Sequence, residues 1–269
     1  MDILKKYRVK PGSKVDLSKW DPADTGKFRS KDEVAEATAG NVQRMADLQY
    51  LLYAEDKRAL LIVLQGMDAG GKDGVIRHVL GPLNPQGCAV TSFKVPTAEE
   101  LAHDFLWRIH RAAPPKGMIG VFNRSHYEDV LVVRVHNMVP KSVWSRRYEQ
   151  INAFERTLAE GGVHLLKFYL HISPEEQLSR LKSRISDPRK HWKINPADFE
   201  ERKLWGRYQS AYEAALSKCS TKIAPWFVVP ADRKWYRDLV VSQIVADSLE
   251  SLGMKFPEPV CDISTLKVQ

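Results

Sequence analysis

A glycine-rich segment that contains one lysine, GMDAGGKDG, combines residue types and spacing that could do chemistry. Gly66, Gly71 and Lys72 satisfy the pattern G-x-x-x-x-G-K between a short apolar run and a helical segment, a setting typical of a P-loop. Glycine lets the backbone approach anionic oxygens closely, and amides at a helix N-terminus add positive potential. The segment therefore predicts a phosphate site in which Lys72 supplies a mobile positive charge. Its candidate phosphate-binding residues are Gly66, Met67, Ala69, Gly70, Gly71 and Asp73.

The loop departs from the usual P-loop at the position that concerns metal binding. Asp73 follows Lys72, where a serine or threonine ordinarily ligates magnesium. Mg²⁺ favours one or two carboxylates together with phosphate oxygens and water. Asp68, inside the loop, is therefore the leading candidate metal ligand. The alternative is a glycine-rich turn with an incidental lysine and no ligand.

A second group of polar residues, NRSHYED, follows another short apolar run. Because ligands collect at the carboxyl ends of parallel strands, this group is expected beside the P-loop. Arg124 could stabilise charge on a transferred phosphoryl group, and Ser125 and Tyr127 could hydrogen-bond phosphate. A surface salt bridge is the alternative for Arg124. Glu128 or Asp129 could hold a metal or orient water, and for both acids a structural role stays open.

A third, basic group lies in a strongly charged, helix-like stretch, residues 173–216, which we interpret as a two-helix projection over the sheet edge. Arg180 and Arg184 are four residues apart and therefore lie on one helical face, from which they could close on phosphates and exclude water. A solvated charged helix is the alternative for any single arginine. The basic residues are Arg180, Arg184, Arg189, Lys190, Lys193 and Arg207, with Trp192 and Trp205 between them.

Short apolar runs that alternate with helical segments predict the elements that position these residues. The runs are Ala59–Leu64, Met118–Phe122, Val163–Leu170 and Trp226–Val229. The first is apolar throughout, as in a parallel strand buried on both faces. One helix is expected after Ser30 and another over 97–112, where Thr97 and Glu100 form a capping-box pattern. The alternation predicts an α/β fold with a central parallel sheet, preceded by an extended arm over residues 1–30.

Length and composition limit the class of protein. A chain of 269 residues, 43% hydrophobic and 28% charged, suits a single α/β domain over 1–269. The sequence shows no signal peptide and no apolar run long enough to span a membrane. Its three cysteines are far apart and match neither a disulfide framework nor a zinc pattern, so we expect a cytoplasmic protein. The net charge of +8 favours a polyanionic partner, either nucleic acid or polyphosphate.

Several blocks of the sequence, taken in order, resemble the second polyphosphate kinase family, particularly its members that accept both nucleoside mono- and diphosphates. The blocks are GMDAGGKDG, HDFLWRIH, VFNRSHYEDVLVVRVH, LHISPEEQ and APWFVVPADRKWYRDLVVSQI. Linked blocks are far more specific than a lone P-loop. The resemblance implies a three-layer P-loop kinase fold, similar to thymidylate kinase, with a helical lid over about 173–210.

The resemblance also assigns roles to particular residues. The family's catalytic aspartate and lysine fall on Asp68 and Lys72, and its second-strand arginine falls on Arg124. The lid arginines of the family match Arg180 and Arg184. Position 123 is Asn where some relatives have Asp, which leaves Glu128 as the candidate for a second metal contact.

The activity implied by the resemblance is transfer of the terminal phosphate of polyphosphate to AMP, ADP or both, giving ADP and ATP, and also to guanine nucleotides. Mg²⁺, with Mn²⁺ as a substitute, would be the cofactor, and relatives suggest a homo-oligomer, a tetramer or dimer. Neither nucleic acid nor membrane is an expected partner. The main alternative is an ATP-dependent nucleoside or nucleotide kinase with the same core. A nucleotide-gated nucleic-acid-binding protein is favoured only by the net charge.

Overall fold

The computed structural model describes residues 3–263 and residue 266. Its centre is a parallel sheet of five strands in the order β2-β3-β1-β4-β5. The strands are β1 (Ala59–Gln65), β2 (Cys88–Ser92), β3 (Ile119–Asn123), β4 (Val163–His171) and β5 (Trp226–Pro230). The predicted α/β fold with a central parallel sheet is therefore confirmed.

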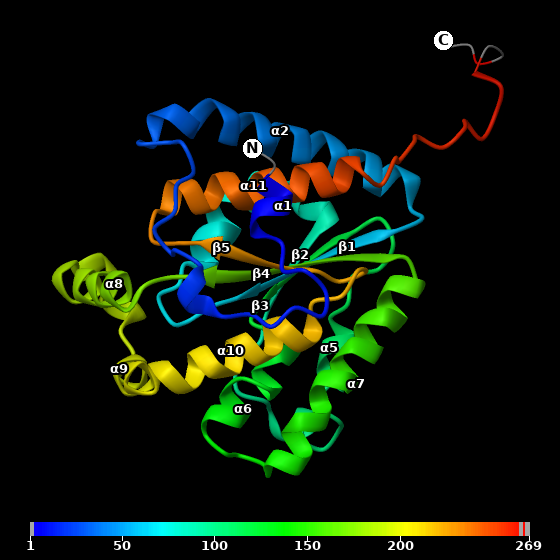
Figure 1. Ribbon diagram of the computed structural model, residues 1–269. Coiled ribbons are helices and arrows are strands. Elements are labelled where there is room, and N and C mark those ends of the chain that lie inside the picture. Colours follow the sequence, from blue (N-terminus) through cyan, green and yellow to red (C-terminus); the bar gives the residue numbers. More distant parts are fainter. Residues whose placement is uncertain (1–2, 264–265, 267–269) are drawn as a thin grey trace.

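Helices cover both faces of the sheet, so that the molecule has three layers (Figure 1). One layer contains α2 and α11, and the other contains α5, α6, α7 and α10. The helices are α1 (Ile3–Tyr7), α2 (Asp32–Glu55), α3 (Lys72–Val75), α4 (Ala98–Leu101), α5 (Trp107–Arg111), α6 (Val132–Val135), α7 (Lys141–Glu160), α8 (Pro174–Ser186), α9 (Pro196–Lys203), α10 (Trp205–Cys219) and α11 (Lys234–Glu250).

The central strand β1 explains why its sequence is apolar without alternation. All seven of its residues are buried, because successive side chains point to opposite faces and both faces carry helices. Leu60, Ile62 and Leu64 pack in the core beneath α2 and α11. Leu61 and Val63 pack in the core beneath α7 and α10. Each predicted apolar run coincides with one of the four strands β1, β3, β4 and β5.

The fifth strand, β2, was not predicted. It lies at the edge of the sheet, where it pairs with β3. Its sequence, CAVTS, is short and half-exposed, so it lacks the continuous apolar run by which a strand buried on both faces is recognised.

The prediction of one continuous helix over 97–112 is wrong, because the segment forms two short helices. The capping box of Thr97 and Glu100 is present, but α4 ends at Leu101 and α5 begins at Trp107. Between them, the Asp104 carboxylate accepts from the backbone amide of Leu106 at 2.9 Å. A side chain that bonds a nearby amide in this way competes with helical hydrogen bonding, and the break follows.

The N-terminal arm lies on the core. Tyr7, Val9 and Leu17 are buried, and the amide of Val9 donates to the carbonyl of Trp226 at 2.9 Å. Arg8 forms an antiparallel bridge with Phe227. The arm therefore covers the outer edge of β5, where exposed backbone groups would otherwise invite pairing with another chain.

The charged stretch predicted as a two-helix projection divides differently. It forms α8, a 3-10 turn (Pro188–Lys193), α9 and α10. The side chains of Ser173, Asp187 and Asn195 cap the first three of these. In Figure 1, α8 and α9 stand beyond the carboxyl ends of the strands, whereas most of α10 runs along the sheet. The extension of the projection to residue 216 is wrong, because Tyr212 and Leu216 of α10 are buried in the core under the sheet.

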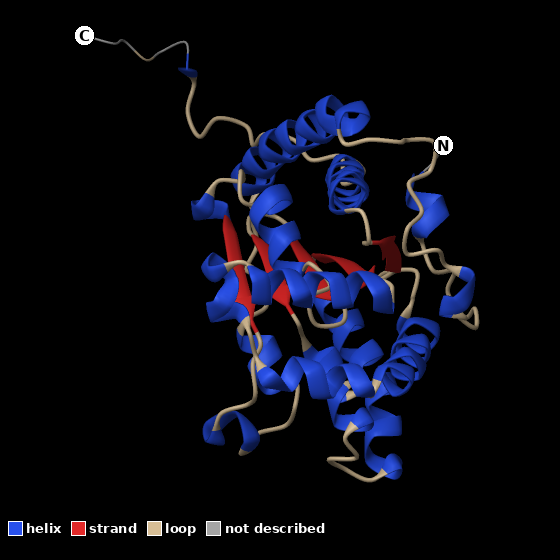
Figure 2. Cartoon of the chain, turned by 90° about the vertical axis from the view of Figure 1, so that its left-hand side faces the viewer, coloured by secondary structure: helices blue, strands red, loops and turns tan. Residues whose placement is uncertain are grey.

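Figure 2, turned by 90°, shows the strands enclosed between the helical layers. Within residues 3–263 and residue 266, no helix combines the length and the apolar character that crossing a membrane would require.

Candidate active site

The pairing of β1 with β3 brings the two predicted loops together. Leu64 lies opposite Asn123 in the parallel register, and the amide of Arg124 donates to the carbonyl of Leu64 at 3.1 Å. The P-loop that leaves β1 and the turn that leaves β3 therefore start side by side at the carboxyl edge of the sheet. This is where ligands bind in open parallel sheets.

Two glycines of the P-loop are required by its conformation. Gly66 has φ +159° and Gly71 has φ +103°; a side chain at Gly71 would strain a left-handed backbone. A Cβ at Gly71 would also lie 2.2 Å from the Nη1 atom of Arg237, and one at Gly66 would lie 2.9 Å from the carbonyl oxygen of Leu170. The loop is therefore held tightly between β4 and α11.

Lys72 lies at the start of α3 and folds back over the loop. Its Nζ donates to the carbonyl of Gly66 at 2.7 Å and to that of Met67 at 3.3 Å. The side chain is buried. Burial, with a further contribution from the positive charge of Arg124, lowers the pKa of Lys72 to about 8.

This lowered pKa predicts a pH dependence of activity. The lysine must be protonated to attract phosphate, and the pKa of the free enzyme appears in kcat/KM. We expect kcat/KM for the phosphate donor to fall about tenfold per pH unit above pH ~8. The fall in kcat should begin at a higher pH than the fall in kcat/KM, because a bound polyanion favours the charged form of Lys72. Steady-state rates from pH 6.5 to 10 test this, with circular dichroism as the control for folding; a flat kcat/KM up to pH 10 contradicts it.

Arg124 is the centre of the site. It adopts φ +62°, which is uncommon for a residue with a side chain. Its Nη2 atom donates to Asp68 Oδ1 at 2.5 Å, and its Nη1 atom donates to Glu128 Oε2 at 3.2 Å. Although burial opposes the charge, the carboxylates of Glu128 and Asp68 raise the pKa of Arg124, so the guanidinium is fully charged.

Asp68 and Glu128 have the chemistry expected of magnesium ligands. No cluster of three or more His, Cys, Asp or Glu side chains suited to a metal occurs among the described residues. Mg²⁺ does not need such a cluster, because one or two carboxylates suffice when phosphate oxygens complete the coordination. The two carboxylates converge on the same guanidinium, and the pair fits that requirement.

Asp73 and Asp129 pair with side chains other than Arg124. The Oδ1 atom of Asp73 accepts from Asn123 Nδ2 at 2.9 Å, which ties α3 to the end of β3. Asp129 pairs with Arg147 at 2.8 Å, and burial raises the pKa of Asp129 to about 6 against the charge of Arg147.

Ser125 and Tyr127 are not brought to the open site. Both are 0% exposed. The Ser125 hydroxyl accepts from Gln65 Nε2 at 3.1 Å, and the Tyr127 hydroxyl donates to Glu155 at 2.8 Å. Their side chains face the core, so neither hydroxyl contacts phosphate in this arrangement.

Three basic residues of the lid were predicted to bind phosphate, Arg180, Arg184 and Lys193, and they occupy different environments. Arg180 is buried against the P-loop, where its Nη1 atom donates to the carbonyl of Ala69 at 2.9 Å. Arg184 pairs with Asp198 at 2.9 Å and so joins α8 to α9. Lys193 lies 4.9 Å from the centre of the Trp192 ring on the exposed turn between the two helices. Only Arg180 contacts the phosphate loop directly.

Replacing Arg180 should therefore lower both stability and activity. Its guanidinium also donates to the carbonyls of Ala231 and Asp232, which Arg180→Ala would leave without these donors. We expect the free energy of unfolding to fall by about 2–3 kcal/mol, with a smaller loss of turnover than a P-loop variant causes. Urea denaturation and steady-state rates measure the two effects. Arg184→Ala is the matched control, because its partly exposed ion pair contributes at most about 1 kcal/mol; equal stability losses in the two variants would contradict this account.

Three residues that contact the site or lie close enough to feel its charge were missed in the sequence. Gln177 Nε2 donates to the carbonyl of Asp68 at 3.0 Å, and the spacing of three residues before Arg180 could have indicated a shared helical face. Arg237 is buried against Gly71 and Gly74. Asp198 has a pKa raised by burial and by the charge of Asp68. Because Arg237 and Asp198 come from distant segments, no local pattern marks either.

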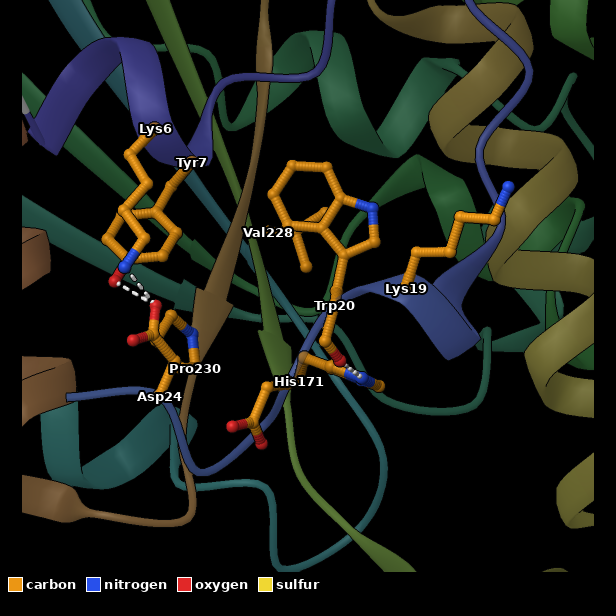
Figure 3. Close-up of a pocket in the computed structure, with 9 residues that line it drawn as sticks. Lys6, Tyr7, Lys19, Trp20, Asp24, His171, Val228 and Pro230 are labelled. Carbon is orange, nitrogen blue, oxygen red and sulfur yellow. Dashed lines mark hydrogen bonds and ion pairs between the residues drawn. The ribbon is translucent and has the colours of Figure 1, made fainter. Parts of the chain in front are cut away.

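A separate pocket lies under the N-terminal arm (Figure 3). Lys6 of this pocket pairs with Asp24, and His171 Nε2 donates to the carbonyl of Trp20 at 3.0 Å. The residues that line it belong neither to the P-loop nor to the Arg124 turn. It is therefore not the phosphate site.

A P-loop that contains a carboxylate and follows a central parallel strand, with an arginine and a second carboxylate after the neighbouring strand, defines the class of P-loop phosphotransferases. Residues 28–257 match the family model described as polyphosphate kinase 2. The chain belongs to the polyphosphate kinase 2 family.

Relatives similar over nearly their whole length include two phosphotransferases. The AMP/ADP-polyphosphate phosphotransferase of Meiothermus ruber is 53% identical over 95% of this chain and 96% of its own length. The ADP-polyphosphate phosphotransferase of Rhodopseudomonas palustris is 49% identical over 94% of this chain and 92% of its own length. The crystal structure of polyphosphate kinase 2 from Arthrobacter aurescens superposes with a TM-score of 0.94, at 43% identity, over 98% of this chain and 94% of that one.

Proposed function

We propose that this protein transfers the terminal phosphate of inorganic polyphosphate to AMP and ADP, giving ADP and ATP. The observation that carries the proposal is that Arg124 pairs with Asp68 of the same P-loop that holds Lys72. Full-length similarity to an AMP/ADP-polyphosphate phosphotransferase supports both acceptors.

The reaction would be a direct in-line displacement. An oxygen of the acceptor's terminal phosphate attacks the terminal phosphorus of polyphosphate, a new P–O bond forms, and the bridging P–O bond to the shortened chain breaks. Such a transfer requires positioning and charge neutralisation rather than covalent catalysis by the protein. Lys72 would neutralise oxygens of the donor, and Arg124 would stabilise charge on the transferred group.

Asp68 and Glu128 are the residues that would hold Mg²⁺, with Mn²⁺ as a substitute. When bound, the ion would neutralise phosphate oxygens and fix their orientation. Arg124 contacts both carboxylates, so it would keep them on the side of the site where the phosphoryl group is transferred. Arg184 and Lys193 of the α8–α9 lid are proposed to approach phosphate only in the closed complex.

The donor distinguishes this proposal from an ATP-dependent kinase with the same core. A net charge of +8 and the basic residues of the lid suit a long polyanion. Purified protein incubated with magnesium, long-chain polyphosphate and either AMP or ADP, without ATP, should form ADP or ATP, separated by chromatography. If no product forms with polyphosphate, but ATP phosphorylates a nucleoside or nucleotide, the protein is an ATP-dependent kinase and the proposal is wrong.

Further properties of the chain remain predictions. They are a single domain over 1–269, use of guanine nucleotides, a cytoplasmic location, a homo-oligomer that is a tetramer or dimer, and the absence of a nucleic-acid partner. Light scattering would measure the oligomeric state. Retardation of DNA or RNA at physiological salt would contradict the last of these predictions.

A further inference from the structure

A cluster of buried charged and polar side chains lies directly beneath the turn that carries Arg124. Lys167 Nζ of β4 donates to Glu155 Oε2 of α7 at 2.5 Å and to the Tyr127 hydroxyl at 2.8 Å. The Tyr127 hydroxyl in turn donates to Glu155 Oε1 at 2.8 Å. His126 Nε2 lies 3.2 Å from the same oxygen. Neither the proposed transfer of phosphate nor the proposed metal site involves these four side chains.

Some side chains of this turn face the core, where the cluster lies, and others face the site. Ser125, His126 and Tyr127 are 0% exposed and point into the core. Arg124 and Glu128, at the two ends of this run, have side chains that are 35% and 15% exposed and contact each other in the site. The positions of the three buried residues therefore determine the positions of Arg124 and Glu128 in the site.

Stability alone does not account for such a cluster. Desolvating a lysine and a carboxylate costs free energy, and apolar replacements of buried ion pairs are often neutral or stabilising. The polar atoms of Lys167, Glu155 and Tyr127 are all hydrogen-bonded, whereas His126 Nδ1 has no partner among the described residues. A buried network whose members are paired in this way favours one arrangement of the chain over its alternatives. Lys167 has a third partner in the carbonyl of Cys219 at 2.7 Å, so the network joins β4, α7 and the end of α10 to one turn.

We propose that Tyr127, Glu155 and Lys167 are positioning residues that hold the Arg124–Glu128 turn so that the Arg124 guanidinium stays on Asp68 and Glu128. The uncommon backbone conformation of Arg124, φ +62°, is consistent with a turn that its surroundings must hold in place. The inference rests on the proposed phosphotransferase function.

The test uses Tyr127→Phe, which removes one hydroxyl and leaves Lys167 with Glu155 and Cys219 as partners. We expect kcat for phosphate transfer from polyphosphate to ADP to fall about tenfold, because a small displacement of a catalytic group is costly. Tyr148→Phe is the matched control. It also removes a buried hydroxyl on the same side of the sheet, whose partner is Arg134 at 3.0 Å, and it should leave kcat unchanged.

Coupling to Arg124 separates positioning from general destabilisation. In an Arg124→Ala background, measured by single turnover with enzyme in excess, adding Tyr127→Phe should lower the rate by a smaller factor than it does in the wild type, since residues that act through one another are not additive. The alkaline limb of kcat/KM should also move to higher pH in Tyr127→Phe, because the charge of Arg124 contributes to the lowered pKa of Lys72.

The outcomes are distinguishable. If the wild type transfers phosphate but Tyr127→Phe has the same kcat, or loses the same factor with and without Arg124, or leaves the alkaline limb in place, the positioning role is wrong. If the wild type itself transfers no phosphate from polyphosphate, it is the proposed function that fails.

Discussion

Lys72→Ala is expected to lower kcat about 10²–10³-fold, the loss typical when one charge-stabilising donor is removed from a transition state. Lys72 is the lysine of the P-loop, and its Nζ already lies over the carbonyls of Gly66 and Met67. Steady-state formation of ADP from AMP and polyphosphate measures the effect.

The variant should remain folded, because the removed side chain belongs to the start of a short helix rather than to an apolar core. Lys203→Ala removes an exposed lysine paired with Glu200 and serves as the control, with turnover unchanged. A Lys72→Ala protein that is folded by circular dichroism and turns over at the wild-type rate would remove this lysine from the reaction.

Asp68→Asn is the second large effect, again a loss of about 10²–10³-fold in kcat. The substitution keeps the size of the side chain and removes the charge that pairs with Arg124 at 2.5 Å. It also weakens a proposed ligand of Mg²⁺, so the concentration of magnesium that gives half-maximal rate should rise. A magnesium titration at saturating polyphosphate and ADP measures both changes.

Asp73→Asn provides a comparison within the same loop. Asp73 contacts Asn123 and not the guanidinium, so we expect a loss smaller than about tenfold, which separates the roles of the two acids. Equal losses in both variants, or an unchanged magnesium requirement in Asp68→Asn, would show that Asp68 is not the metal-binding carboxylate of the loop.

Much of the phosphate site could be predicted from the sequence because its signals are local. The run ALLIVLQ and the segment GMDAGGKDG are contiguous, so a buried strand, a glycine turn and a lysine follow one another by necessity. The position of Arg124 beside the loop could also be predicted, because parallel strands end at one edge. The register of Leu64 with Asn123 bears this out.

Other features depend on packing between distant segments, and they could not be predicted in this way. The side chain of Tyr127 turns into the core because Glu155 and Lys167, from α7 and β4, accept and donate hydrogen bonds there. The helical spacing of Arg180 predicted a lid residue, but apart from Glu176 on its own helix its partners are backbone carbonyls of the P-loop and of the segment after β5. Because every residue has a backbone carbonyl, the sequence does not show which carbonyls a side chain will contact.

We propose that the P-loop site transfers phosphate directly from polyphosphate to a nucleotide, without a phosphorylated protein. The most direct test uses polyphosphate labelled with ³²P and unlabelled AMP, with magnesium and without ATP, quenched during the first turnovers. The account predicts label in the β-phosphate of ADP and none on the protein. Labelled protein that passes its label to AMP, or labelled nucleotide that forms only when ³²P is supplied as ATP, would contradict it.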